Sequence, residues 1–295
     1  MARDGYAWWY VDALSDDGAH ALTLIAFIGS VFSPYYAAAR RRAPADPEQH
    51  VAFNVALYGA GTGRWAMTER GRQHLQRDAD HLRIGPSGLH WQGGALCAEI
   101  DEWCVPWPRR LRGRLRLGAL ALPGTCFALD AAARHRWQPI APLARIDVAF
   151  EEPALRWSGN AYFDHNQGDE PLERAFRYWS WSRRTRADGE TGIDYDVLRR
   201  DGSRRGLSLA CDRHGRLAAA EPMAATLLPR SRWGLARSVR GPMTLWRTLE
   251  DGPFYARALL RGTDGGHAVH ESLSLERFDR RWVQSLLPFR MPRRA

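Results

Sequence analysis

The amino-acid sequence predicts an all-β protein, and three observations lead to that fold class. Apolar residues alternate with polar ones at 111–117, 146–150 and 273–275, as they do in strands that bury one face. Only residues 35–42 and 172–179 show a pattern compatible with an amphipathic helix. Turn signals separate the runs at hairpin spacing, namely Asp16-Asp17-Gly18, Asp188-Gly189, Asp201-Gly202, His214-Gly215 and Asp264-Gly265-Gly266.

Taken in order along the chain, the elements indicate two antiparallel β units. The aromatic run at 8–12 and the turn at 15–18 predict a first hairpin, and strand-like segments follow at 21–32 and 51–58. Acidic residues and a Pro at 150–153 follow a strand and mark a joint, after which the chain is rich in hairpin signals. We therefore expect β domains at 1–153 and 154–295, each a barrel or sandwich, packed together.

Composition is that of a soluble globular protein. Of the 295 residues, 45% are hydrophobic and 25% are charged. No apolar run approaches the roughly 18 residues that a membrane-spanning helix needs. The first residues lack the basic and apolar regions of a secretory signal, so we expect a cytoplasmic location.

The motifs of metal, dinucleotide and serine chemistry are missing from the sequence. The four Cys residues show no C-x-x-C spacing and the ten His residues show no H-E-x-x-H pattern, so the thiols are interpreted as packing residues. The glycine-rich run 59–63 lacks both the final Gly of a dinucleotide loop and a following helix. Residues 85–88 lack the G-x-S-x-G spacing of a hydrolase elbow.

The basic residues are all Arg, and the formal net charge is +9. They gather at 40–42, 109–116, 199–205 and 290–294 with acidic residues between them. Such scattered clusters are interpreted first as solvated surface, second as a membrane-facing patch, and last as a nucleic-acid site. No helix-turn-helix, RRM or zinc-finger signature accompanies them, so we expect no nucleic-acid partner.

Acids and aromatics crowd into residues 135–166 and form the leading candidate site. Strand alternation places His135 and Trp137 on one face of their strand, and Tyr162 and Asp164 on one face of theirs. His165 then points to the opposite face. Two such pairs facing one cavity would surround a ligand with an imidazole, an indole, a phenol and a carboxyl. The alternative is a buried polar network that only fixes the core.

Blocks at 5–18, 26–36, 64–71, 135–142, 159–166, 270–275 and 287–292 together resemble the acyclic carotenoid 1,2-hydratase family, also called hydroxyneurosporene synthases. The resemblance implies two lipocalin-like β units with an active site near their interface, and no cofactor or metal. It implies a hydro-lyase that adds water to the terminal C1=C2 bond of acyclic carotenoids such as neurosporene or lycopene. The family's catalytic positions fall on His135, Trp137, Tyr162 and Asp164.

These implications lead to a mechanistic hypothesis. Asp164, kept protonated by burial, would protonate C2, and water would capture the tertiary cation at C1. Trp137 and Tyr162 would stabilise the cation, while His135 would either hold Asp164 in its acid form or accept a proton from water. Because the substrate dissolves in membranes, we expect peripheral docking on the inner or photosynthetic membrane through the arginines at 40–42 or 109–116. A non-catalytic terpenoid carrier and a cofactor-free polyene cyclase are the alternatives.

Overall fold

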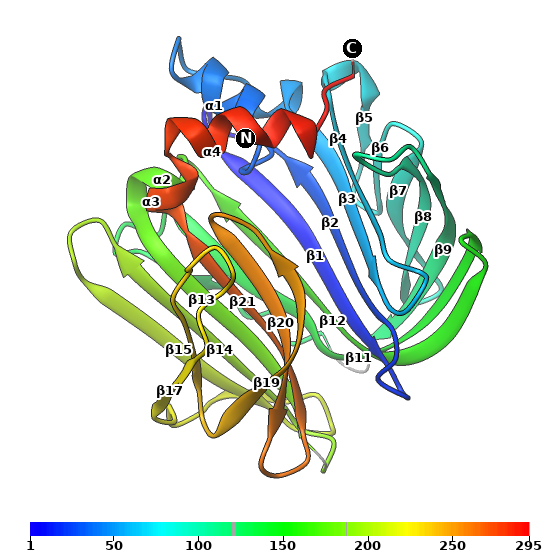
Figure 1. The fold of residues 1–295 in the computed structure, drawn as a ribbon, viewed down its shortest axis with the longest axis vertical. Helices are drawn as coiled ribbons and strands as arrows, with labels where there is room; N and C mark the ends of the chain where they lie inside the picture. Colours follow the sequence, from blue (N-terminus) through cyan, green and yellow to red (C-terminus); the bar gives the residue numbers. More distant parts are fainter. Residues whose placement is uncertain (120–121, 187, 295) are drawn as a thin grey trace. The chain divides into compact units, whose positions relative to one another are not determined.

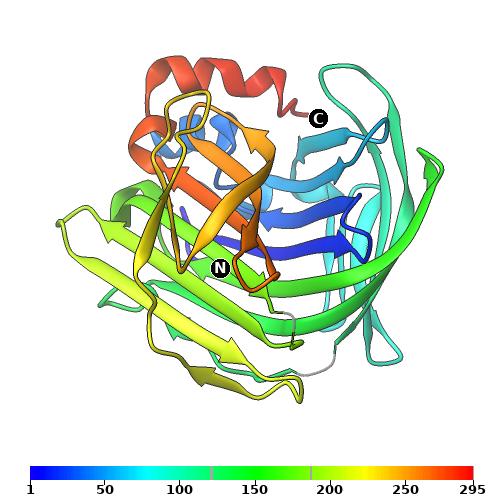
Figure 2. The same cartoon turned by 60° about the horizontal axis from the view of Figure 1, so that its bottom comes forward.

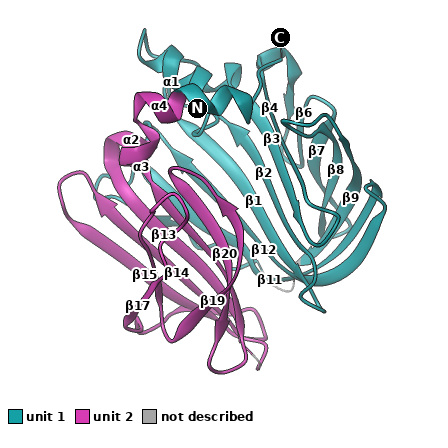
Figure 3. Ribbon diagram, in the orientation of Figure 1, with its two compact units in different colours: residues 1–171, 285–295 teal, residues 172–284 magenta. Residues whose placement is uncertain are grey.

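The computed structural model describes residues 1–119, 122–186 and 188–294 (Figure 1). Most of its regular elements are β-strands and its helices are short, which confirms the all-β prediction. The chain forms two compact units, called unit 1 for Met1–Pro171 with Ser285–Ala295 and unit 2 for Leu172–Gln284 (Figure 3). The division into domains at 153 and 154 stays a prediction. Residues 153 and 154 lie in the turn between the two longest strands of unit 1.

Unit 1 is built on one antiparallel sheet that curls along its length (Figure 2). A short strand, β10 (Phe127–Ala128), pairs with β11 outside the main order. The other strands, in their spatial order, are β4 (Arg64–Arg70), β3 (Val51–Tyr58), β2 (Ala21–Ile28), β1 (Tyr6–Ser15), β12 (Leu155–Gly168), β11 (His135–Glu152), β9 (Arg110–Ala119), β8 (Ala95–Trp103), β7 (Ser87–Gln92), β6 (His81–Ile84) and β5 (Leu75–Arg77).

Helical segments of unit 1 are few. The predicted helix at 35–42 is α1 (Pro34–Arg40), whose first turn is capped by the Ser33 hydroxyl and begins with a Pro that needs no hydrogen-bond acceptor. Single 3-10 turns occur at Pro47–Gln49, Arg72–His74 and Leu287–Phe289. The last turn follows α4 (Arg281–Leu286), which the sequence pattern did not predict and which runs from unit 2 into unit 1.

Strand β1 is buried on both faces, which explains why its sequence does not alternate between apolar and polar residues. Val11 and Ala13 face the main apolar cluster of unit 1, together with Leu22, Leu24 and Phe53. Tyr6, Trp8, Tyr10 and Asp12 alternate with these residues, face the other side of the sheet and are also buried. This second buried face is called the polar face below, because it carries acids, amides and phenols among its aromatics.

Unit 2 contains a second antiparallel sheet and a separate strand pair. The sheet order is β16 (Leu217–Ala219), β15 (Arg204–Cys211), β14 (Thr191–Arg199), β13 (Phe176–Thr185), β21 (His267–Ser274), β20 (Tyr255–Gly262) and β19 (Met243–Asp251). The pair is β17 (Ala225–Leu228) with β18 (Arg237–Arg240), and two single helical turns are α2 (Leu172–Ala175) and α3 (Leu275–Phe278). The helix expected at 172–179 ends after α2, because Phe176 onward pairs with strands on both sides.

Gly159 allows the close approach of β1 and β12. A methyl group there would stand 2.0 Å from the carbonyl oxygen of Leu14 and 2.8 Å from Ser15 Cα, which are backbone atoms that cannot rotate away. We expect Gly159→Ala to destabilise the protein by about 1 to 3 kcal/mol or more. Denaturant unfolding measures this change. The control is Gly118→Ala on β9, where nothing lies within 4 Å of the new methyl group. Equal stability of the two variants would contradict this account of the β1–β12 contact.

Candidate active site

The strand register gathers the predicted site residues on the polar face. On β12, Asp164 is paired with Tyr10 of β1 on one side and with Pro139 of β11 on the other. Tyr162 is paired with Asp12 of β1, and Asn166 with Trp8 of β1 and Trp137 of β11. Directly paired residues share a face of an antiparallel sheet, so these side chains line one continuous strip across β1, β12 and β11.

Asp164 is the centre of a buried hydrogen-bond cluster. Its Oδ2 accepts the indole N–H of Trp137 at 2.8 Å and the hydroxyl of Tyr162 at 2.9 Å. Its Oδ1 lies 3.3 Å from Asn166 Nδ2. Asp164 is 3% exposed, and Trp137 and Tyr162 are fully buried. Two strong donors therefore converge on one oxygen, and the other oxygen has a weaker contact with an amide donor.

Tyr162 is held in its neutral form. Burial, followed by the neighbouring carboxyls of Asp164 and Asp12, raises the pKa of the Tyr162 hydroxyl well above its usual value. The phenol can therefore donate a hydrogen bond at any physiological pH, and it is not a candidate base.

His135 lies on the same face at the other end of the strip. Its Nδ1 is 2.8 Å from the Tyr6 hydroxyl, and its Nε2 is 3.4 Å from Glu170 Oε1. Its backbone N–H donates to Asp130 Oδ1 at 2.8 Å. Burial lowers the pKa of the His135 imidazole, although Asp130 and Glu170 act in the opposite direction. The ring is therefore neutral at neutral pH and can accept a proton.

The structure brings three of the four predicted residues into direct contact and sets His135 apart from Asp164. His135 is paired with Gly168, four residues along β12 from Asp164. At the rise of a strand this is roughly 13 Å between backbone positions. Trp137, paired with Asn166, stands between the two positions.

Aromatic rings surround the cluster on the polar face. Tyr10 packs edge-on against Tyr162 with 6.3 Å between ring centroids, and Phe127 of β10 lies 5.6 Å from Trp137. Tyr6 stacks on Trp8 at 5.0 Å. The site therefore combines polar groups with large apolar surfaces, as a site for an apolar ligand that reacts with an acid requires.

The four predicted site residues leave out several members of this strip. Tyr6, Tyr10 and Asp12 belong to it, and the alternation of side chains in any strand, applied to the predicted first strand, would have placed them on one face. Asp12 is of particular interest, because it is 1% exposed and is the second carboxyl beside Tyr162. His165 faces the other way, as expected. Its ring packs 4.8 Å from Trp9, and burial lowers its pKa to about 4.

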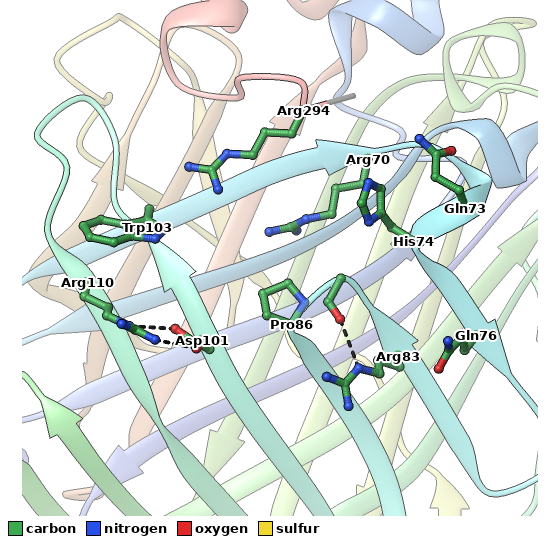
Figure 4. Close-up of a pocket in the computed structure, with 11 residues that line it drawn as sticks. Arg70, Gln73, His74, Gln76, Arg83, Pro86, Asp101, Trp103, Arg110 and Arg294 are labelled. Carbon is green, nitrogen blue, oxygen red and sulfur yellow. Dashed lines mark hydrogen bonds and ion pairs between the residues drawn. The ribbon is translucent and has the colours of Figure 1, made fainter.

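A separate cavity of about 510 Å³ lies elsewhere in unit 1, near β4, β6, β8 and β9 (Figure 4). Arg70, Arg83, Arg110 and Arg294 line it together with Asp101 and Trp103. We call it the arginine pocket. None of the four predicted site residues lines it.

Neither a metal cluster nor a membrane-spanning helix was found within the described ranges. No group of three or more His, Cys, Asp or Glu side chains there is placed to hold a metal ion. No helix in those ranges has the length and apolar character needed to cross a bilayer.

Comparisons with known proteins point in one direction. The family model of the carotenoid hydratase CrtC matches residues 24–295. The acyclic carotenoid 1,2-hydratase of Rubrivivax gelatinosus is 49% identical over 99% of this chain and 74% of its own length. The enzyme of the same name from Thiocapsa roseopersicina is 50% identical over 98% of this chain and 73% of its own length.

Solved structures share the fold at low sequence identity. A structure assigned to AttH of Nitrosomonas europaea has a TM-score of 0.63, with 15% identity and 92% of each chain covered. Kievitone hydratase from Nectria haematococca has a TM-score of 0.53, with 8% identity, 94% of this chain and 90% of that chain covered. These likenesses confirm the lipocalin-like β fold class.

Proposed function

This chain belongs to the carotenoid hydratase CrtC family, and on that premise we propose that Asp164 is the acid with which it hydrates the terminal double bond of an acyclic carotenoid. The protein is a hydro-lyase. The observation that carries the assignment of the acid is a buried carboxyl, bonded by Trp137 and Tyr162, on a face lined with aromatic rings.

The proposed reaction needs one acid and one water molecule. Asp164 gives its proton to C2 of the C1=C2 bond, and the electron pair of that bond forms the new C–H bond. The tertiary cation left at C1 is captured by water, and loss of a proton from that water gives a tertiary alcohol. The proton returns to the site, so the sum is the addition of one water. The net reaction consumes only the alkene and water, because the proton that water loses restores the acid.

The hydrogen bonds of Asp164 are compatible with a neutral carboxyl. The C=O oxygen of a protonated carboxyl can accept two hydrogen bonds, which is the role that Oδ2 has towards Trp137 and Tyr162. The proton then resides on Oδ1, where the nearest amide donor is 3.3 Å away. Burial favours this neutral form, whereas the donors favour the carboxylate. A further influence must therefore keep the proton in place at neutral pH.

Asp12 supplies that influence in our proposal. Because Asp12 is paired with Tyr162, it is a diagonal neighbour of Asp164, at roughly 7 to 8 Å. Two buried carboxyls this close repel one another when both are charged, so a negative charge on one favours the protonated form of the other. A negative Asp12 keeps the proton on Asp164. On β1, β12 and β11 the other ionisable side chains of this face include Tyr6, Tyr10, His135, Arg145, Asp147, Arg156 and Tyr162, and the neighbouring strands add Tyr58, Glu69, Arg114 and Arg116.

The rings of Trp137 and Tyr162 can stabilise the cation, by roughly 0.5 to 2 kcal/mol each. This is too little to account for catalysis alone. Because both rings are fixed by their bonds to Asp164, they also position the double bond against the acid, and positioning is worth several kcal/mol more.

His135 is proposed to accept the proton that the attacking water loses, and not to hold Asp164 in its acid form. The register places it roughly 13 Å along the strand from Asp164, while Tyr6 and Glu170 lie next to its two ring nitrogens. Because C1 is bonded to C2 and therefore lies next to Asp164, the neutral imidazole would be the final acceptor of the proton that water releases at C1, reached through the Tyr6 hydroxyl and intervening water.

Peripheral binding to the inner or photosynthetic membrane, from the cytoplasmic side, would give the enzyme access to a substrate dissolved in lipid. Arg41 and Arg42 are exposed, and Arg112, Arg114 and Arg116 project outward from β9 at every second position. Each exposed arginine that lies close to an anionic lipid surface strengthens binding to that surface by about 1 kcal/mol.

Mass spectrometry of carotenoid extracts tests the proposed function. Purified protein incubated with lycopene or neurosporene in detergent should yield a product heavier by one water. A carrier would return the carotenoid unchanged, and a cyclase would give an isomer of the same mass with altered chromatographic retention. Either of these outcomes, in place of a mass gain, would overturn the hydratase assignment.

A further inference from the structure

The arginine pocket gathers positive charge from four separate segments of unit 1. Arg70 comes from β4, Arg83 from β6, Arg110 from the start of β9, and Arg294 from the C-terminal tail (Figure 4). Like charges held this close repel one another, so such a cluster is expected to be compensated by acids of the protein or by an anion from outside.

The protein compensates only half of this charge. Arg70 forms an ion pair of 2.7 Å with the buried Glu102, and Arg110 forms a two-bond fork with Asp101 at 2.8 and 2.9 Å. Arg83 donates through Nε to the backbone carbonyl of Gly85 at 3.1 Å. Across residues 1–119, 122–186 and 188–294, neither Arg83 nor Arg294 forms an ion pair, although the Glu102 carboxylate, which pairs with Arg70, also attracts Arg294 at longer range.

The chain holds Arg294 at this position by specific contacts. Residues 292–294 run beside β4, with the Glu69 N–H donating to Pro292 O at 3.0 Å and the Arg294 N–H donating to Glu69 O at 2.9 Å. The Arg293 side chain pairs with the buried Glu69 carboxylate. The tail is therefore fixed by its neighbours, and the Arg294 guanidinium is left to line the cavity.

One exposed tryptophan lines the pocket, and a second lies in the loop that follows it along the chain. Trp103 lines it and is 41% exposed, and Trp107, in the loop that follows, is 75% exposed. Exposed indoles beside arginines are typical of surfaces that contact the headgroup region of a bilayer, where a ring with one polar edge is well accommodated.

We propose that the arginine pocket binds the phosphate of an anionic phospholipid headgroup, with Arg83 and Arg294 as its principal ligands. Guanidinium groups present parallel N–H donors that match two oxygens of a phosphate. The pocket of about 510 Å³ is large enough for a headgroup. The inference rests on the proposed function, because a lipid-dissolved substrate gives the enzyme a reason to bind a bilayer, and it refines the docking face to a defined site.

Vesicle co-sedimentation of the full chain tests the pocket. The probes are vesicles of phosphatidylcholine alone and of phosphatidylcholine with phosphatidylglycerol. We expect wild type to prefer the anionic vesicles, and the double variant Arg83→Gln/Arg294→Gln to bind them roughly 10- to 30-fold more weakly, from two surface arginines. The matched control, Arg204→Gln/Arg205→Gln, removes the same charge from exposed positions of β15 that have no role in the proposed docking, and it should lose less than about threefold.

The outcomes separate the alternatives. Equal losses of vesicle affinity in the two double variants would mean a general electrostatic attraction. Unchanged affinity of the pocket variant would mean that the lipid binds elsewhere. Either result would overturn the proposed phosphate site. If wild type binds inorganic phosphate by calorimetry but not the vesicles, the lipid assignment is wrong. Thermal unfolding verifies that the variants fold. Hydration by wild type in detergent is measured separately, so failure of the proposed function is recognised independently of the vesicle result.

Discussion

Asp164→Asn is expected to lower kcat/KM for carotenoid hydration by roughly 10²- to 10⁴-fold, the usual contribution of a general acid. The amide keeps an oxygen that can accept the bonds from Trp137 and Tyr162, so the cluster and the fold should persist. It has no acidic proton to give. The measurement is the initial rate of formation of the hydrated product, together with the unfolding midpoint of the variant.

A matched control makes the same chemical change outside the site. Asp147 lies at an exposed position on β11, and its Oδ1 accepts a hydrogen bond of 2.6 Å from the Ser158 hydroxyl. Asp147→Asn should keep the wild-type rate. An Asp164→Asn variant that folds and retains full activity would remove Asp164 as the proton donor.

Asp12→Asn is expected to change the pH dependence of the reaction. Activity requires a protonated Asp164, so the rate falls as pH rises and that proton is lost. A negative Asp12 opposes this loss, and its removal should therefore move the alkaline limb of the kcat/KM profile to lower pH. At the separation that the register implies, the expected displacement is roughly one to two pH units. The full pH–rate profile of each variant measures it.

A second variant with the opposite expected sign distinguishes this role from a structural one. Asn166 donates to Asp164 Oδ1, a contact that favours the carboxylate. Asn166→Ala should therefore move the alkaline limb to higher pH. A uniform loss of rate in both variants, with the limb unmoved, would show that Asp12 supports the fold without controlling the proton.

The fold class could be predicted because hairpin turns and alternating strands are local patterns. Local patterns were insufficient where burial was two-sided. On strand β1, Val11 points into the apolar cluster, whereas Tyr10 and Asp12 lie on the polar face. Both faces are buried, so the sequence of β1 gives no clear alternation. The segment from Phe176 to Trp179 has a helix-like pattern and is nevertheless a strand, because β14 and β21 pair with it on either side.

The sequence could predict which residues belong to the site more readily than how far apart they lie. Alternation assigns a side chain to a face of its strand, and this correctly separated His165 from Asp164. Register between strands depends on bulges, such as the one after Pro139, which the sequence does not reveal. The pairing of His135 with Gly168 and of Asp12 with Tyr162 is equally a matter of which strands meet and in what register, so both relations required the three-dimensional structure.

The central claim is that an acid of the polar face protonates C2 and that water then captures the cation at C1. Hydration in D₂O containing ¹⁸O, followed by mass spectrometry and NMR of the purified product, tests it most directly. With wild-type protein, the account predicts a product that carries one carbon-bound deuterium at C2 and one ¹⁸O atom in the C1 hydroxyl. With Asp164→Asn, it predicts that this product is lost. Oxygen at C2, or a product without carbon-bound deuterium, would contradict it.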